Sequence, residues 1–137
     1  MLKCFSLSFI LLLILFLIQN CQWIEYESAQ IVVDSEYITL EWDPPDVNKN
    51  IDSPVTAYRI YYRVHEMQYW TLIDVIPAEQ YPKYKVYHSK LGNGVYDFAI
   101  RAVVSNGRIS SLHSSLDLNA DPLGGWYVVW MRFEDDE

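Results

Sequence analysis

Large apolar residues recur at every second position in several stretches of this chain, with polar residues between them. In one such stretch Ile38, Leu40 and Trp42 alternate with Thr39 and Glu41. A period of two places one set of side chains on one buried face only when the backbone is extended. The pattern therefore predicts β-strands, and no stretch after residue 20 shows a convincing helical period.

The same alternation predicts seven short strands along the chain. Pro44-Pro45 ends the expected strand at 37–43, because proline cannot donate a hydrogen bond to a sheet. Asn106-Gly107 predicts a hairpin turn, since both residues tolerate positive φ. Turn signals at roughly 8–12-residue spacing are typical of an antiparallel β-sandwich. The expected strands are a short edge strand at 31–33 and strands at 37–43, 56–65, 70–75, 83–89, 95–105 and 109–116.

The alternation also separates the expected core from the expected surface. On the strand at 56–65, Arg59, Tyr61 and Arg63 should point outward, away from the core. The residues expected to fill the space between two sheets are Trp42, Tyr58, Ile60, Leu91, Tyr96, Phe98 and Ile100.

The first twenty residues have a different composition from the rest. Lys3 precedes an apolar run at 5–18 that is broken only by two serines. A run of this length is shorter than the roughly 20 residues that a bilayer-spanning helix needs, and it is typical of a secretory signal peptide. We expect residues 1–20 to be a signal peptide, with an uncleaved membrane anchor as the alternative.

Residues 17–21, Leu-Ile-Gln-Asn-Cys, resemble a bacterial lipobox in the relaxed form of spirochaete lipoproteins. The resemblance implies that Cys21 is lipidated and becomes the new N-terminus, with 21–29 as a tether. Since Cys4 would leave with the signal, Cys21 would be a lone thiol in an oxidising compartment, and lipidation would consume it. A free or intermolecularly paired Cys21 is the alternative. The expected location is the cell envelope, at the outer membrane or the periplasmic side of the inner membrane.

Residues 30–119 resemble a fibronectin type III domain. The resemblance implies an immunoglobulin-like β-sandwich, in which the Tyr96 hydroxyl forms a tyrosine corner by bonding to backbone near Leu91. The residues 120–137 that follow are expected to form an aromatic strand and an acidic tail. The motifs that carry the resemblance are Trp42 before Pro44-Pro45, Tyr58-x-Ile60-x-Tyr62-Arg63, and Leu91 ahead of Tyr96-x-Phe98-x-Ile100-Arg101-Ala102-Val103.

Charge and side-chain chemistry narrow the classes of function. The formal net charge is −8, and loss of Lys3 with the signal makes it −9, which disfavours nucleic acid and anionic headgroups as partners. The histidines 65, 88 and 113 lie on three different expected strands, so we expect no catalytic residue, metal or cofactor. A small enzyme is the least favoured alternative.

Aromatic residues are the feature with functional promise, since the chain has 5 Trp and 11 Tyr. Exposed Tyr and Trp are common anchors of protein interfaces and also stack on sugar rings. We therefore expect a non-enzymatic module for protein binding or adhesion, with an unidentified partner, and carbohydrate binding as the alternative. Residues 126–131 would add a strand at a sheet edge or pair with another protein's sheet. The candidate binding aromatics are Tyr61, Tyr69, Tyr81, Tyr87, Trp126 and Trp130.

Overall fold

Two β-sheets make up the described part of the chain, which in this computed structural model comprises residues 26–44, 54–78 and 82–133. The expected signal peptide, Cys21, most of the tether, Tyr81 and the last four acidic residues lie outside these ranges. No helix within the described ranges is long and apolar enough to cross a membrane.

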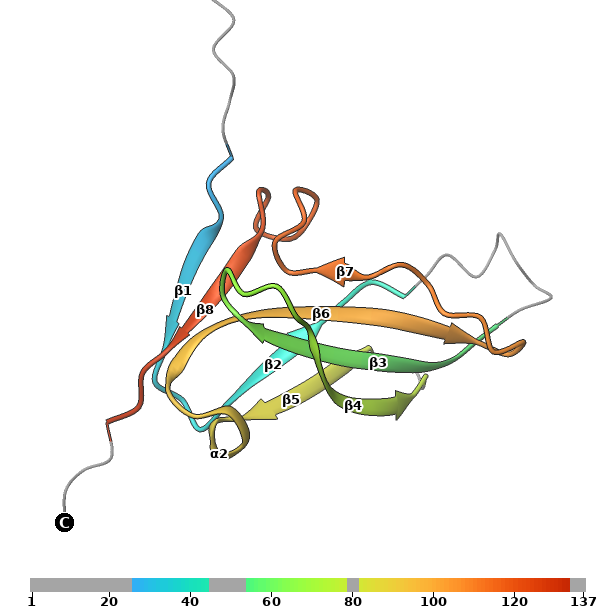
Figure 1. Cartoon of the computed structure of the whole chain (residues 1–137), viewed down its shortest axis with the longest axis horizontal. Helices are drawn as coiled ribbons and strands as arrows, with labels where there is room; N and C mark the ends of the chain where they lie inside the picture. Colours follow the sequence, from blue (N-terminus) through green and yellow to red (C-terminus); the bar gives the residue numbers. More distant parts are fainter. Residues whose placement is uncertain (1–25, 45–53, 79–81, 134–137) are drawn as a thin grey trace, which may run out of the picture.

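A six-stranded sheet has the order β1-β8-β6-β3-β4, with β7 also paired to β6, and a second sheet consists of β2 and β5 (Figure 1). The all-β class and the two sheets agree with the alternating pattern. A four-residue helix, α2, follows β5. The elements are β1 (Ala29–Val33), β2 (Tyr37–Glu41), β3 (Val55–Val64), β4 (Thr71–Pro77), β5 (Lys83–Tyr87), α2 (His88–Leu91), β6 (Gly94–Val104), β7 (His113–Ser114) and β8 (Trp126–Trp130).

The aromatic strand expected within 120–137 is present as β8, but the expectation of an all-antiparallel arrangement requires correction, because the pairing of β8 with β1 is parallel. The register runs from Ala29 opposite Trp126 to Val33 opposite Trp130. On its other side β8 pairs antiparallel with β6. The strand is therefore inside the sheet rather than at its edge, and both of its backbone edges are already hydrogen-bonded. A period of two shows that a segment is extended but not which strands become its neighbours.

One side of β6 is covered by two separate pieces of chain, β7 and β8. Just after β7 the chain still lies along β6, because the Ser115 N–H donates to the Phe98 carbonyl at 2.7 Å, and beyond Ser115 it separates from β6. It returns at Trp126, whose N–H donates to the Ser115 carbonyl at 2.7 Å. Residues 116–125 thus form an excursion, which here means a loop between two segments, β7 and β8, that pair with the same side of β6. Gly125, with φ +85°, lies at its base, where a Cβ atom would come within 2.6 Å of the Leu116 backbone.

The core lies between the two sheets and is formed by the inward-facing residues of their strands. Ile60 and Trp130 are fully buried, and the Trp130 indole N–H donates to the Ser35 carbonyl at 2.8 Å. Three expected core residues, Trp42, Leu91 and Ile100, are only partly buried and pack against this cluster. The buried cluster consists of Leu40, Tyr58, Ile60, Val86, Tyr96, Phe98, Ala102, Val128 and Trp130.

The Tyr96 side chain ties β6 to the turn that precedes it. Its hydroxyl donates to the Leu91 carbonyl at 2.7 Å, with the Gly92 carbonyl 3.1 Å away. The ring lies directly over Gly94, where a Cβ atom would be 2.7 Å from the hydroxyl oxygen. Glycine is therefore needed at position 94 for the ring to reach the turn.

Candidate binding site

The side of the six-stranded sheet that is turned away from β2 and β5 carries arginine and aromatic side chains. On β3 the outward residues Arg59, Tyr61 and Arg63 alternate with the buried Tyr58 and Ile60. This alternation follows directly from the period of two in the sequence. We call this side the outer face, defined by the outward residues of β3, β4 and β6 together with segments 66–70 and 109–112.

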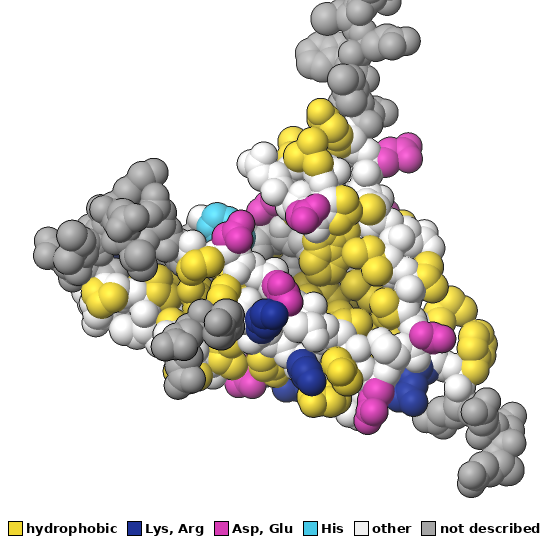
Figure 2. All heavy atoms as spheres, turned by 180° about the vertical axis from the view of Figure 1, so that it is seen from behind, with side chains coloured by type: hydrophobic (Ala, Val, Ile, Leu, Met, Phe, Trp, Pro, Cys, Tyr) yellow, Lys and Arg dark blue, Asp and Glu magenta, His cyan; other side chains and the backbone are white. Residues whose placement is uncertain are grey.

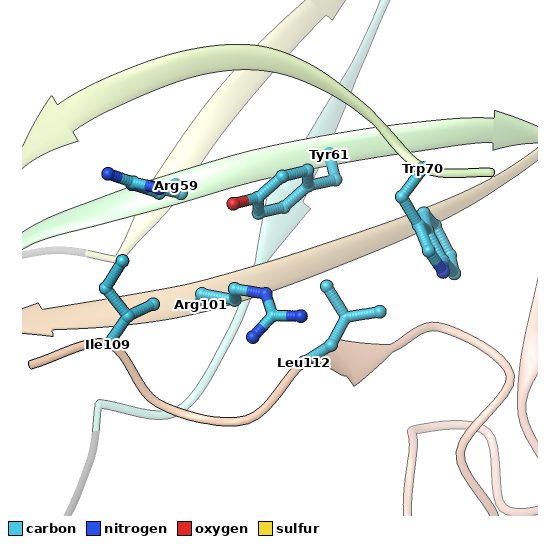
Figure 3. Close-up of a pocket in the computed structure, with 6 residues that line it drawn as sticks. All are labelled: Arg59, Tyr61, Trp70, Arg101, Ile109 and Leu112. Atoms are coloured by element: carbon cyan, nitrogen blue, oxygen red, sulfur yellow. The ribbon is translucent and has the colours of Figure 1, made fainter.

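A shallow pocket of about 400 Å³ lies on the outer face (Figure 3). In Figure 3 its side chains project from β3 and β6 toward the segments that flank them. Ala99 lies opposite Tyr61 across the β3–β6 pair. The pocket is lined by Arg59, Tyr61, Trp70, Arg101, Ile109 and Leu112.

Two guanidinium groups provide the charge of the pocket. An Arg101 Nη atom donates to the Ser110 carbonyl at 3.1 Å, and the Arg101 guanidinium carbon is 6.0 Å from the centre of the Tyr61 ring. The Arg59 Nε is buried and has no hydrogen-bond partner among the described residues. Within the described ranges neither arginine forms an ion pair with a carboxylate.

Exposed apolar side chains surround the pocket. Leu72 lies opposite Tyr61 and Val75 lies opposite Arg59 on β4, so both share the outer face. Their exposed fractions are 46% and 48%, and that of Tyr69, in the segment before β4, is 80%. Protein interfaces are enriched in Tyr, Trp, Met and Arg, so this composition is typical of an interface. The other exposed apolar residues of the outer face are Met67 and Ile109.

A buried carboxylate lies at the neighbouring position on the outer face. Asp97 is fully buried, with one oxygen 2.8 Å from the Arg63 Nε and the other 2.7 Å from the His65 Nδ1. The Arg63 guanidinium also lies 4.4 Å from the centre of the Trp70 ring, and the His65 ring stacks on Tyr127 at 4.1 Å. Arg63 and His65 thus share the Asp97 carboxylate, and the Arg63 contact holds Trp70 at the wall of the pocket.

The candidate aromatics occupy different places. Tyr61 lines the pocket, and Tyr69 lies in the segment beside it. Tyr87 is exposed on the other sheet, where its ring packs against Tyr37 at 5.7 Å. Trp126 is partly buried and packs against the core. Trp130 is not available to any partner, because its side chain is fully buried, and its assignment as a binding aromatic is therefore corrected. Tyr81 lies outside the described residues.

The structure does not bring the histidines together. His65 contacts Asp97, and His88 lies in α2 with its Nε2 2.8 Å from the Asn93 side-chain oxygen. His113 is exposed on β7. The described ranges contain no group of three or more His, Cys, Asp or Glu side chains able to hold a metal ion.

Two tyrosines away from the pocket have raised pKa values. Burial raises the pKa of Tyr84 to about 12, with further contributions from its hydrogen bond to Asp74, at 3.0 Å, and from the charge of that carboxylate. Burial, followed by the proximity of Tyr62, raises the pKa of Tyr96. Both phenols therefore remain protonated at neutral pH.

Hydrophobic side chains also gather on the reverse side of the molecule, beside the upright arm formed by β1 and β8 (Figure 2). On β1, Ile31 and Val32 are 37% and 63% exposed.

Arg59, Arg101, Trp70 and Leu112 line the pocket but were not among the candidate binding residues predicted from the sequence. Their outward positions could be read from the alternation, but their convergence depends on the register between strands.

No family model matches this chain. It is similar to a juxtamembrane domain-associated catenin from Caenorhabditis elegans, with 33% identity over 79 residues. The match covers 56% of this chain and 6% of that protein.

Proposed function

We propose that this chain is a non-enzymatic binding module, exported and held at a membrane by a lipid on Cys21, that contacts a protein partner through the outer face. The observation that carries the proposal is the pocket between Arg59 and Arg101, with its partly exposed Tyr61 and Trp70 and its exposed apolar surroundings.

The finer fold assignment is part of the proposal. A fibronectin type III arrangement is supported by the hydrogen bond of Tyr96 to Leu91 and by the separation of β2 and β5 from β3, β4 and β6. The parallel pairing of β1 with β8 extends the larger sheet beyond β6.

A preorganised aromatic anchor loses little conformational freedom on binding. Trp70 is held by the Arg63 guanidinium, and Arg63 is in turn fixed by the buried Asp97. Tyr61 lies on a central strand that is paired on both sides, with β4 and with β6. The aromatic walls of the pocket are thus supported by the sheet, as an interface hot spot requires.

Carbohydrate binding is the second candidate, and the open ring of Tyr69, 80% exposed, is the observation that favours it. Sugar rings stack on aromatic faces, however, and one face of Trp70 is already occupied by Arg63. The exposed Leu72 and Val75 offer area to an apolar protein surface but no hydrogen bonds to hydroxyl groups. A protein partner therefore fits the outer face better.

The nematode relative supports the same class of activity. Its name describes association with a juxtamembrane domain, which is a contact between proteins. The similarity covers 56% of this chain, and we extend to the chain only the general class, protein binding next to a membrane.

Site-specific photocrosslinking in living cells tests the binding face. A photoreactive amino acid at Leu72, on the outer face, should give a discrete protein adduct, whereas the same group at Lys85, exposed on the other sheet, should not. Equal labelling from both positions, or glycan adducts in place of protein adducts, would refute the proposal.

Metabolic labelling tests the anchor separately. Cells that express the chain should incorporate labelled palmitate into it, and the Cys21→Ala variant should lose the label. Retention of the label by that variant would refute a lipid anchor on Cys21.

A further inference from the structure

Arg59 and Arg101 are direct partners across the β3–β6 pair. Residues in this relation have Cβ atoms about 5 Å apart and share one face of the sheet, and like charges there are destabilising. The chain nevertheless places two arginines together in the pocket. A binding function would explain an arrangement that weakens the isolated domain.

Two outward positions further along β3, an arginine faces an acidic residue instead of a second arginine. There Arg63 lies opposite Asp97, and their ion pair is short and partly buried. Tyr61 opposite Ala99 separates the two pairs. The same ladder therefore contains one cation matched by an acid of the chain and one pair of cations with no described acid between them.

The surroundings of the arginine pair favour an anion. None of the six residues that line the pocket is acidic, although the chain as a whole has a formal net charge of −8. The buried Nε of Arg59 has lost water without gaining a described partner. Trp70, Ile109 and Leu112 lower the local dielectric constant, which strengthens attraction between a guanidinium and an anion.

We propose that the Arg59–Arg101 pair receives a carboxylate side chain, of Asp or Glu, from the protein partner, while apolar neighbours of that residue rest on Trp70, Ile109 and Leu112. This inference rests on the proposed function. Guanidinium groups bind planar carboxylates through paired, charge-assisted hydrogen bonds. A single carboxylate also fits better than a polyanionic glycan or an anionic membrane, because the acidic remainder of the chain repels extended negative surfaces.

A small probe tests the chemistry without knowledge of the partner. The full chain in zwitterionic detergent is titrated with 4-methylpentanoate and, as a matched neutral control, with 4-methylpentanamide, while the Nε–H signals of Arg59 and Arg101 are followed by NMR. The carboxylate should shift both signals saturably and the amide should not. Equal shifts with the amide, or equally tight binding of sulfate, would overturn the proposal.

Variants separate a binding role from a packing role. Arg59→Gln and Arg101→Gln should each weaken binding of 4-methylpentanoate by about tenfold or more, as expected for loss of a charge-assisted hydrogen bond. Arg108→Gln, at an exposed arginine outside the pocket, should bind normally. At low salt the Arg59→Gln variant should melt no lower than wild type, since like-charge repulsion is relieved. A lower melting temperature together with unchanged probe binding would identify Arg59 as a packing residue only.

The two proposals can fail independently. A protein adduct at Leu72 without selective carboxylate binding would refute the arginine site and leave the outer face as an interface. Selective carboxylate binding without an adduct at Leu72 would refute the proposed interface and leave a site for small carboxylates.

Discussion

Replacement of Tyr96 by phenylalanine removes one hydroxyl group and leaves the ring that covers Gly94. The hydroxyl donates to the Leu91 carbonyl at 2.7 Å, and the Tyr96 side chain is 5% exposed. Loss of a buried hydrogen bond that leaves its partner unsatisfied costs about 1–3 kcal/mol. Because the turn at 91–93 is partly open to water, we expect about 2 kcal/mol, or roughly 8–16 °C in melting temperature for a domain near 100 residues.

Urea unfolding, followed by tryptophan fluorescence, measures this free energy directly. Tyr62→Phe is the matched control, because Tyr62 packs edge-on against the Tyr96 ring, with centroids 6.1 Å apart, but its hydroxyl forms no hydrogen bond within the described residues. The control should change the free energy of unfolding by less than about 0.5 kcal/mol. If the two variants lose equal stability, or if Tyr96→Phe loses none, the hydroxyl does not fix the turn to β6.

Three further predictions concern other parts of the fold. Asp97→Ala should lower the free energy of unfolding in urea by about 3–5 kcal/mol, because it leaves the Arg63 guanidinium without its buried counter-charge and the His65 ring without its hydrogen-bond partner; an unchanged midpoint would contradict this. Tyr84→Phe should remove part of the alkaline destabilisation: the raised pKa of about 12 favours the neutral phenol in the folded state, so its contribution is present below the ordinary pKa near 10 and is lost as pH rises through 12. Thermal melts across that range should show wild type losing stability more steeply than the variant. Gly125→Ala should destabilise the fold by more than about 1 kcal/mol, since the position combines φ +85° with backbone atoms 2.6 Å from the new Cβ; a melting temperature equal to wild type would show that the loop base adapts freely.

The alternating pattern was enough to anticipate the strands that contribute most to the core. β3 and β6 are the longest strands, at 10 and 11 residues, and each carries several inward apolar residues in succession. A long alternating run determines which of its residues point inward and which point outward. The bond between Tyr96 and Leu91 was expected for a different reason, since it follows from the resemblance to a family rather than from periodicity.

The parts that were missed depend on contacts between distant segments. The composition of Trp126–Trp130 fits either a buried strand or an exposed aromatic patch. Only the position of this segment between β1 and β6 shows that Trp130 is buried. Asp97 occupies an outward position of the alternation, yet Arg63 and His65 enclose it, and the pattern alone does not show these contacts. The arginine pair of the pocket likewise appears only when the register places residue 59 opposite residue 101.

The excursion at 116–125 has a consequence for how this domain can diversify. Its two ends meet through the hydrogen bond between Ser115 and Trp126, so the ladder on β6 closes behind the loop. Lengthening a flexible loop costs little, about 0.6 kcal/mol for each doubling. A sequence inserted near Leu118 or Leu123, which are 60% and 63% exposed, would leave β7 and β8 paired with β6 as before. This position could therefore carry a grafted epitope or an affinity tag, and related chains can be expected to differ there in length.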